Sequence, residues 1–80
     1  MTMLAVFKSR AQTLDCISYL RCAGVPAQSV STPKEAGVGC GISARFEDVF
    51  FPRVKLLLER RPYSSFAGYL KRAGGTFVSL

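Results

Sequence analysis

The chain has 80 residues, of which 49% are hydrophobic and 20% are charged. A chain of this length supports one hydrophobic core, and its apolar content excludes intrinsic disorder, so we expect residues 1–80 to form a single domain with a core over about 3–71 and a tail over 72–80. No stretch approaches the roughly 20 apolar residues of a membrane span, and residues 1–10 lack the pattern of an export signal, which predicts a cytoplasmic protein.

The net charge of +6 comes from eleven Lys and Arg against five Asp and Glu. The basic residues are spread along the chain, which is typical of a solvated surface, although attraction of nucleic acid, anionic lipid or an acidic protein is an alternative. The chain has no histidine, and its three cysteines form no CxxC pair. No metal, no cofactor, and no Ser-His or Cys-His nucleophile pair is therefore expected, which excludes hydrolase and cofactor-dependent sites.

The beginning of the chain predicts a strand followed by a helix. Residues 3–7 are an apolar run of strand length, and the S-x-x-Q spacing from Ser9 to Gln12 has the form of a capping box. Gly24 is expected to end the helix. Apolar residues recur in it at intervals of three and predict one buried stripe: Leu14, Ile17, Leu20 and Ala23.

The remainder of the chain predicts three more strands and one more helix. A short strand is expected over 27–32, a glycine-rich loop over 34–41, an alternating strand over 42–46, a helix over about 52–61 and a strand over 66–71. The order βαββαβ predicts an α+β fold, a two-layer ferredoxin-like sandwich in which a four-stranded sheet carries two helices on one face. Residues 74–80 are either a frayed end or an added edge strand.

Cys16 and Cys22 lie six residues apart on the predicted first helix. This separation turns them by about 240° around the helix axis and places them on different faces, so they are not expected to pair. The favoured interpretation of each is a small buried apolar side chain in its reduced form.

Cys40 lies among Gly37, Gly39 and Gly41, and the lack of side chains at these glycines leaves the sulfur accessible. Backbone N–H groups of such a turn favour an anion, and Lys34 or Arg45 would add positive potential, so a thiolate or persulfide would be stabilised. The chemistry that this permits is sulfur exchange. An alternative interpretation has equal support from the sequence: the glycines only build a hairpin loop, and Cys40 has no chemical role.

The chain resembles the selenium/sulfur (Se/S) carrier protein-like family, a group of small bacterial proteins. The resemblance spans about residues 3–71 and rests on the opening strand with its Ser-led helix, the Pro33-Lys34 pair, the Cys40-Gly41 step and the alternating strand 42–46. It implies that Cys40 is the carrier residue, and that the partners are a desulfurase-like protein donor of sulfur or selenium and a protein acceptor. Any enzymatic role would be at most that of a sulfur-relay or sulfurtransferase-like protein.

Two other functions remain open from the sequence. The chain is alternatively a non-catalytic regulatory or assembly module that acts through a free sheet face, for example as a homodimer. A nucleic-acid-binding domain ranks last, because only the net charge and the aromatic residues Tyr63, Phe66 and Tyr69 point to it.

Overall fold

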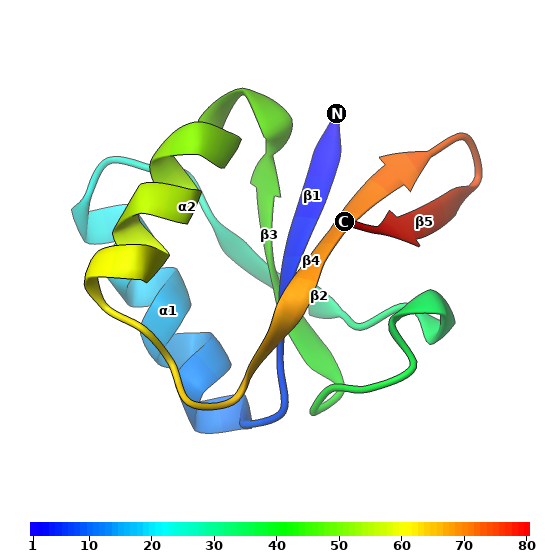
Figure 1. Cartoon of the computed structure of the whole chain (residues 1–80), viewed down its shortest axis with the longest axis horizontal. Coiled ribbons are helices and arrows are strands. Elements are labelled where there is room, and N and C mark those ends of the chain that lie inside the picture. The colour runs from blue at the N-terminus through cyan, green and yellow to red at the C-terminus, as the bar shows by residue number, and fades with distance from the viewer.

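The computed structural model describes all residues from 1 to 80 and contains a five-stranded sheet with two α-helices (Figure 1). The order of the elements along the chain is β1 (Thr2–Phe7), α1 (Arg10–Cys22), β2 (Gln28–Ser31), β3 (Ile42–Glu47), α2 (Phe51–Arg60), β4 (Phe66–Ala73) and β5 (Thr76–Ser79). Two short 3-10 helices, η1 (Lys34–Ala36) and η2 (Asp48–Phe50), precede β3 and α2. The sheet order is β2-β3-β1-β4-β5, and every neighbouring pair is antiparallel.

The predicted four-stranded sandwich is wrong, because the C-terminal segment adds a fifth strand to the sheet. The fold is nevertheless α+β. Strand β5 pairs with β4 from Thr76 opposite Ala73 to Ser79 opposite Leu70. Gly74 and Gly75 make the connection, and a two-residue glycine loop is well suited to a tight hairpin. The hairpin therefore uses the glycine pair and the short apolar segment that follows it.

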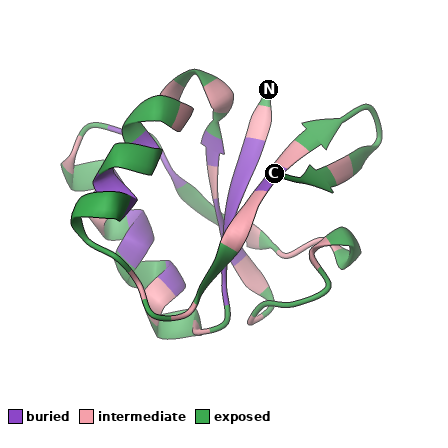
Figure 2. Ribbon diagram, viewed as in Figure 1, coloured by how far each residue is buried: buried purple, intermediate pink, exposed green.

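Strand β1 lies at the centre of the sheet, and all but its first residue are buried. Met3, Ala5 and Phe7 belong to the main core that the helices cover, whereas Leu4 and Val6 belong to a second cluster. Because side chains alternate between the two faces of a strand, both faces of β1 are covered. This double burial explains why residues 3–7 are a continuous apolar run, and Figure 2 shows the buried strand in purple.

The second face of the sheet is not free, contrary to what the predicted sandwich implied. Leu4, Val6 and Leu70 are each at most 3% exposed, and Ala36 of η1 and Phe77 of β5 pack against them. In Figure 1 the helices lie on one side of the sheet, and η1 and β5 lie on the other. The chain itself therefore covers part of the surface on which an assembly-module function is predicted, and a hollow of about 440 Å³ beside Leu4, Val30 and Phe77 stays open.

Helix α1 begins and ends where the sequence predicts, but its buried stripe differs. The Ser9 hydroxyl accepts a hydrogen bond from the Gln12 backbone N–H at 3.2 Å, and Gly24 adopts φ +85° just beyond the C-cap. The buried residues are Thr13, Cys16, Ile17 and Leu20. Leu14 is 47% exposed, because residues three apart drift by about 60° around a helix at each step and four of them cannot share one narrow stripe.

Candidate functional site

The three cysteines are all free thiols, and they lie in three different environments. Cys16 is fully buried, and this burial, together with the nearby Asp15 carboxylate, raises the pKa of its thiol to about 12. Cys22 is exposed at the end of α1, so its predicted burial is wrong. Cys40 is partly exposed. Cys40 and Cys22 are therefore the thiols that another molecule can reach.

Cys40 lies at the end of the loop that leads into β3, against the first turns of α1. Its Sγ is 3.4 Å from the Thr13 Oγ1 and 3.4 Å from the carbonyl oxygen of Ile42. Thr13 is completely buried, so packing fixes the position of its hydroxyl. The partly exposed sulfur consequently has one side in solvent and the other against two oxygen atoms held by regular secondary structure.

The pKa of the Cys40 thiol is lowered from its ordinary value. Partial burial acts in the opposite direction and raises the pKa, but hydrogen bonding from Thr13 and from backbone groups at Ile42 and Cys40 outweighs it, and the positive charge of Arg10 adds to the lowering. These are the stabilising interactions that favour a thiolate over a thiol. Thr13 and Arg10 were not identified from the sequence, because both are distant in the chain from Cys40 and no local pattern links them.

The Thr13 hydroxyl has a second partner, the carbonyl oxygen of Ser9, to which it donates at 2.9 Å. A hydroxyl has one proton, so Thr13 cannot donate to Ser9 and to Cys40 at the same time. In the neutral site the Cys40 S–H can donate to the Ile42 carbonyl while Thr13 donates to Ser9. In the ionised site the Thr13 proton is free to turn from Ser9 toward the sulfur, which gives the thiolate a donor without movement of the backbone.

The glycine-rich loop is fixed by packing at Gly39. This residue has φ +129°, and a Cβ built on it would lie 3.2 Å from the Thr32 Cγ2 and 3.3 Å from the Val6 Cγ1. On the other side of Cys40, the Gly41 carbonyl accepts a hydrogen bond from the Thr32 backbone N–H at 3.0 Å, and the Gly37 N–H donates to the Lys34 carbonyl at 3.1 Å. Only glycine combines this backbone conformation with this close approach, so the loop holds Cys40 in a defined place.

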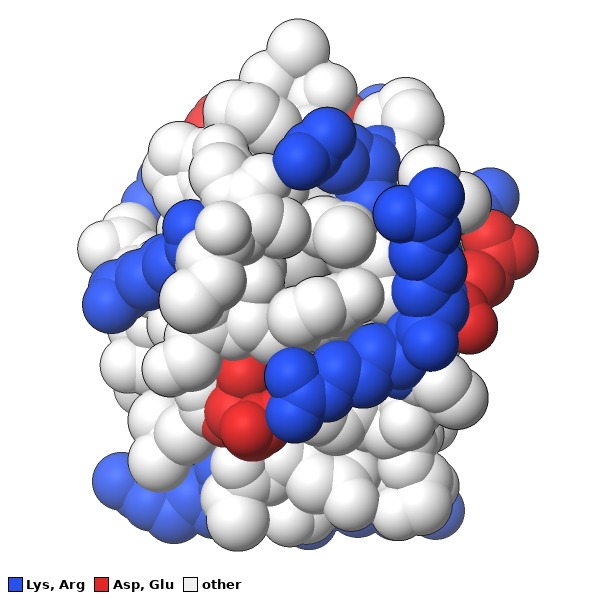
Figure 3. Space-filling model, turned by 90° about the vertical axis from the view of Figure 1, so that its left-hand side faces the viewer, with Lys and Arg blue, Asp and Glu red and all other residues white.

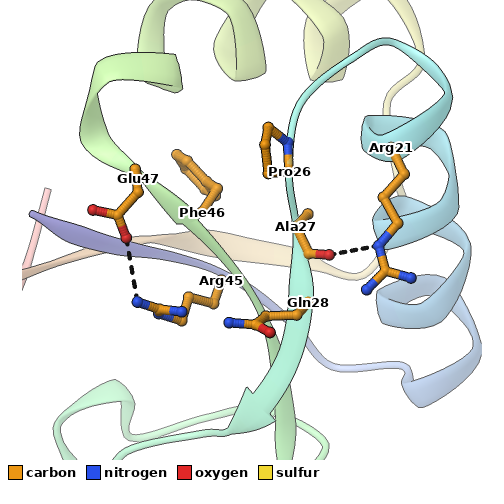
Figure 4. A pocket seen from close by; sticks show the side chains of 7 residues that line it. All are labelled: Arg21, Pro26, Ala27, Gln28, Arg45, Phe46 and Glu47. Carbon is orange, nitrogen blue, oxygen red and sulfur yellow. Dashed lines mark hydrogen bonds and ion pairs between the residues drawn. The ribbon is translucent and has the colours of Figure 1, made fainter.

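The two cations predicted to support Cys40 lie in different places. Lys34 belongs to η1 and lines a shallow hollow together with the three loop glycines. Arg45 lies on β3, where its guanidinium is 3.3 Å from the Glu47 carboxylate. Figure 4 shows Arg45 beside a cavity of about 370 Å³ whose wall also includes Arg21.

Basic side chains do not form one continuous patch. On the face that the helices build, some Lys and Arg side chains lie next to one another in an arc that acidic side chains border, and others stand apart (Figure 3). Arg61 of this region is 2.9 Å from Asp15. The discontinuous charge agrees with a solvated surface more than with a nucleic-acid-binding groove.

The fold and the site together define a small α+β protein with one partly exposed thiol whose pKa is lowered. The chain belongs to the family described as "Putative Se/S carrier protein-like", which matches residues 2–64. The matched region contains Cys40, its loop and both helices, whereas β4 and β5 lie beyond it. No curated protein and no solved structure matches the chain. Neither helix has the length and apolar character needed to cross a membrane.

Proposed function

We propose that Cys40 is the residue on which this protein carries sulfur or selenium, as a persulfide or a selenosulfide, between a protein donor and a protein acceptor. The observation that supports the proposal best is the environment of the Cys40 sulfur. It is partly exposed, its pKa is lowered, and the fixed Thr13 hydroxyl lies 3.4 Å away. The family to which the chain belongs points to the same cargo.

The proposed transfer is an exchange at sulfur that needs no external oxidant or reductant. The Cys40 thiolate attacks the terminal sulfur of a donor persulfide, the S–S bond of the donor breaks, and the donor thiolate leaves with the bonding electron pair. Cys40 now bears the terminal sulfur. In the second step an acceptor thiolate attacks this terminal sulfur, and Cys40 leaves as a thiolate, ready for another cycle.

The surroundings of Cys40 suit both halves of this cycle. Thr13 and Arg10 favour the thiolate, which is the attacking group in the first step and the leaving group in the second. In this proposal Lys34, on the rim of the loop hollow, attracts the anionic persulfide of the donor. Gly37, Gly39 and Gly41 keep large side chains away from the approach to the sulfur.

The test is loading by a cysteine desulfurase that generates a persulfide from free cysteine. We expect intact mass to show one added sulfur atom on the wild-type chain, and peptide mapping to place it on Cys40. The Cys40→Ser variant should lose loading, whereas Cys22→Ser, the control at the other reachable thiol, should keep it. Equal loading of Cys40→Ser, or loading confined to Cys22, would contradict the proposal. Repeating the experiment with free selenocysteine distinguishes selenium from sulfur.

A further inference from the structure

A second feature, separate from the Cys40 loop, is an apolar groove between α2 and the beginning of β4. Its volume is about 370 Å³. The wall consists of four apolar or aromatic side chains and Pro62, with one cation and one carboxylate beside them: Leu58, Tyr63, Phe66, Tyr69, Pro62, Lys55 and Glu59. The Phe66 and Tyr69 rings lie 4.9 Å apart, and Phe66 is 37% exposed although it is a large apolar side chain.

The strand that forms one wall of this groove has an unpaired outer edge. Strand β5 pairs with β4 only from Leu70 onward, and the Leu80 N–H extends this pairing to the Tyr69 carbonyl. Phe66 to Gly68 have no strand on that side. The register with β1 also breaks here, because Val6 lies opposite Gly68 and Phe7 opposite Phe66, which leaves the exposed Ala67 without a partner on either side.

We infer that the groove and the open edge of β4 together bind an extended peptide segment of a partner protein. Main-chain hydrogen bonds to an unpaired strand edge give such a complex its affinity, and a neighbouring pocket for alternate side chains gives it specificity. The stretch is only three residues long, so it suits a short linear segment better than a full strand. Lys55 and Glu59 in the groove wall offset each other, so the preference for a segment with apolar side chains and net negative charge comes from the apolar wall and from the net charge of +6 of the whole chain.

The groove and the Cys40 site both contact the same turn of α1. The Gln12 side chain accepts hydrogen bonds from the Ser65 N–H at 2.9 Å and the Ser65 hydroxyl at 2.6 Å, just before β4 begins. The next residue, Thr13, contacts Cys40. Both sites therefore rest on the same rigid part of the helix.

The two sites also lie at the same end of the sheet. Ser43 at the start of β3 lies opposite Val6, and Phe66 at the start of β4 lies opposite Phe7. Two strand spacings, roughly 10 Å, separate these starting points, a span that three or four extended residues cover. The assignment of the partner as the sulfur donor or acceptor rests on the proposed function, whereas the binding of an extended segment does not.

The test uses the full-length Cys40→Ser chain, so that no thiol chemistry at Cys40 contributes. A random peptide library displayed on phage is selected against it, and enriched peptides are synthesised and added to the isotope-labelled protein. We expect these peptides to alternate apolar and polar residues, to carry net negative charge, and to shift the amide resonances of Ala67 and Gly68. Lack of enrichment, peptides that shift only β2, or a dimer that buries the β4 edge would each overturn the inference.

Two variants and one matched control sharpen the result. Ala67→Pro removes the N–H at the unpaired position and should weaken peptide binding at least about fivefold, the value of one hydrogen bond. Lys55→Glu lies on the exposed face of α2 and should weaken binding without risk to the fold. Lys71→Glu makes the same charge change on β4 beyond the groove and should leave affinity unaltered. Sulfur loading without peptide binding would remove this inference alone, and peptide binding without loading would remove the carrier function alone.

Discussion

Cys16 is part of α1 and Cys40 packs against the same helix, yet the structure gives the two thiols opposite pKa shifts. Cys16 points into the core from the helix itself, where burial raises the pKa of its thiol to about 12. Cys40 approaches the helix from the β3 loop, where the Thr13 hydroxyl and the charge of Arg10 help to lower the pKa of its thiol. Only one helical turn separates Cys16 from Thr13. The reactivity of each thiol therefore depends on whether its sulfur lies in the core or on the partly exposed side of this turn.

The largest expected effect is the difference in alkylation rate between these two thiols in the folded protein. At a pH of about 7.5, a thiol with a pKa of about 12 is ionised in about one molecule in 30,000. We expect Cys40 to react with iodoacetamide at least about 100-fold faster than Cys16, even though the rarer thiolate is intrinsically more nucleophilic. Mass mapping of a time course measures both rates. In guanidinium chloride the rates should converge, and equal rates in the folded chain would refute the comparison.

The next effect is on the free energy of unfolding, which should depend on Cys16 more than on Cys40. Cys16→Ser places a hydroxyl in an apolar core and should lower the free energy of unfolding by about 1–3 kcal/mol. Cys40→Ser keeps a polar atom next to Thr13 at a partly exposed position and should change it by less than about 0.5 kcal/mol. Urea unfolding of both variants checks this. A larger loss in Cys40→Ser would mean that the residue is retained for structure.

Much of the fold follows from local patterns that a sequence makes visible. The Ser9 cap and the Gly24 stop are as predicted, because each depends on residues within one or two helical turns. The fifth strand was not decided by the sequence, because four residues after a glycine pair carry too little periodicity to separate an edge strand from a loose end. β5 is held by its pairing with β4 and by the packing of Phe77, and Glu35 adds two hydrogen bonds from residues 41 and 42 positions away.

In the candidate site too, features formed by neighbouring residues are visible in the sequence, whereas contacts between residues far apart in the chain are not. Cys40 and the loop glycines stand together in the sequence, and their spacing was sufficient to single them out. Thr13 was assigned to no role, because a threonine inside a helix gives no sign that a loop 27 residues away will pack against it. The unpaired edge at Ala67 was equally invisible, since it depends on where β5 stops pairing.

A smaller effect tests whether the Thr13 hydroxyl acts on Cys40. Thr13→Val keeps the shape of the side chain and removes the proton donor, so the pKa of Cys40 should rise. Its alkylation rate near neutral pH should fall about threefold to tenfold, the effect of one ordinary hydrogen bond. The pH dependence of alkylation should move to higher pH. Thr13→Ser retains a hydroxyl and should preserve most of the rate. An unchanged profile in the valine variant would show that Thr13 only fills space.

The smallest expected effect concerns the C-terminal strand, which Glu35 ties to η1 at the beginning of the Cys40 loop. Its carboxylate accepts from the Thr76 hydroxyl at 2.6 Å and from the Phe77 N–H at 3.2 Å, and these hydrogen bonds lower the pKa of Glu35 from its ordinary value of 4.5. Because the pKa in the folded chain is the lower one, the contribution of this contact is complete above pH 4.5 and is lost as the pH falls through the folded pKa. Hydrogen exchange at the Phe77 amide, corrected for its intrinsic pH dependence, should therefore lose a few-fold of protection only in acid. Glu35→Gln should exchange faster than the wild-type chain at neutral pH and show no such step. If the variant and the wild type exchange alike at every pH, η1 and β5 are held by the Ala36 and Phe77 packing alone, and the Cys40 loop does not depend on this carboxylate.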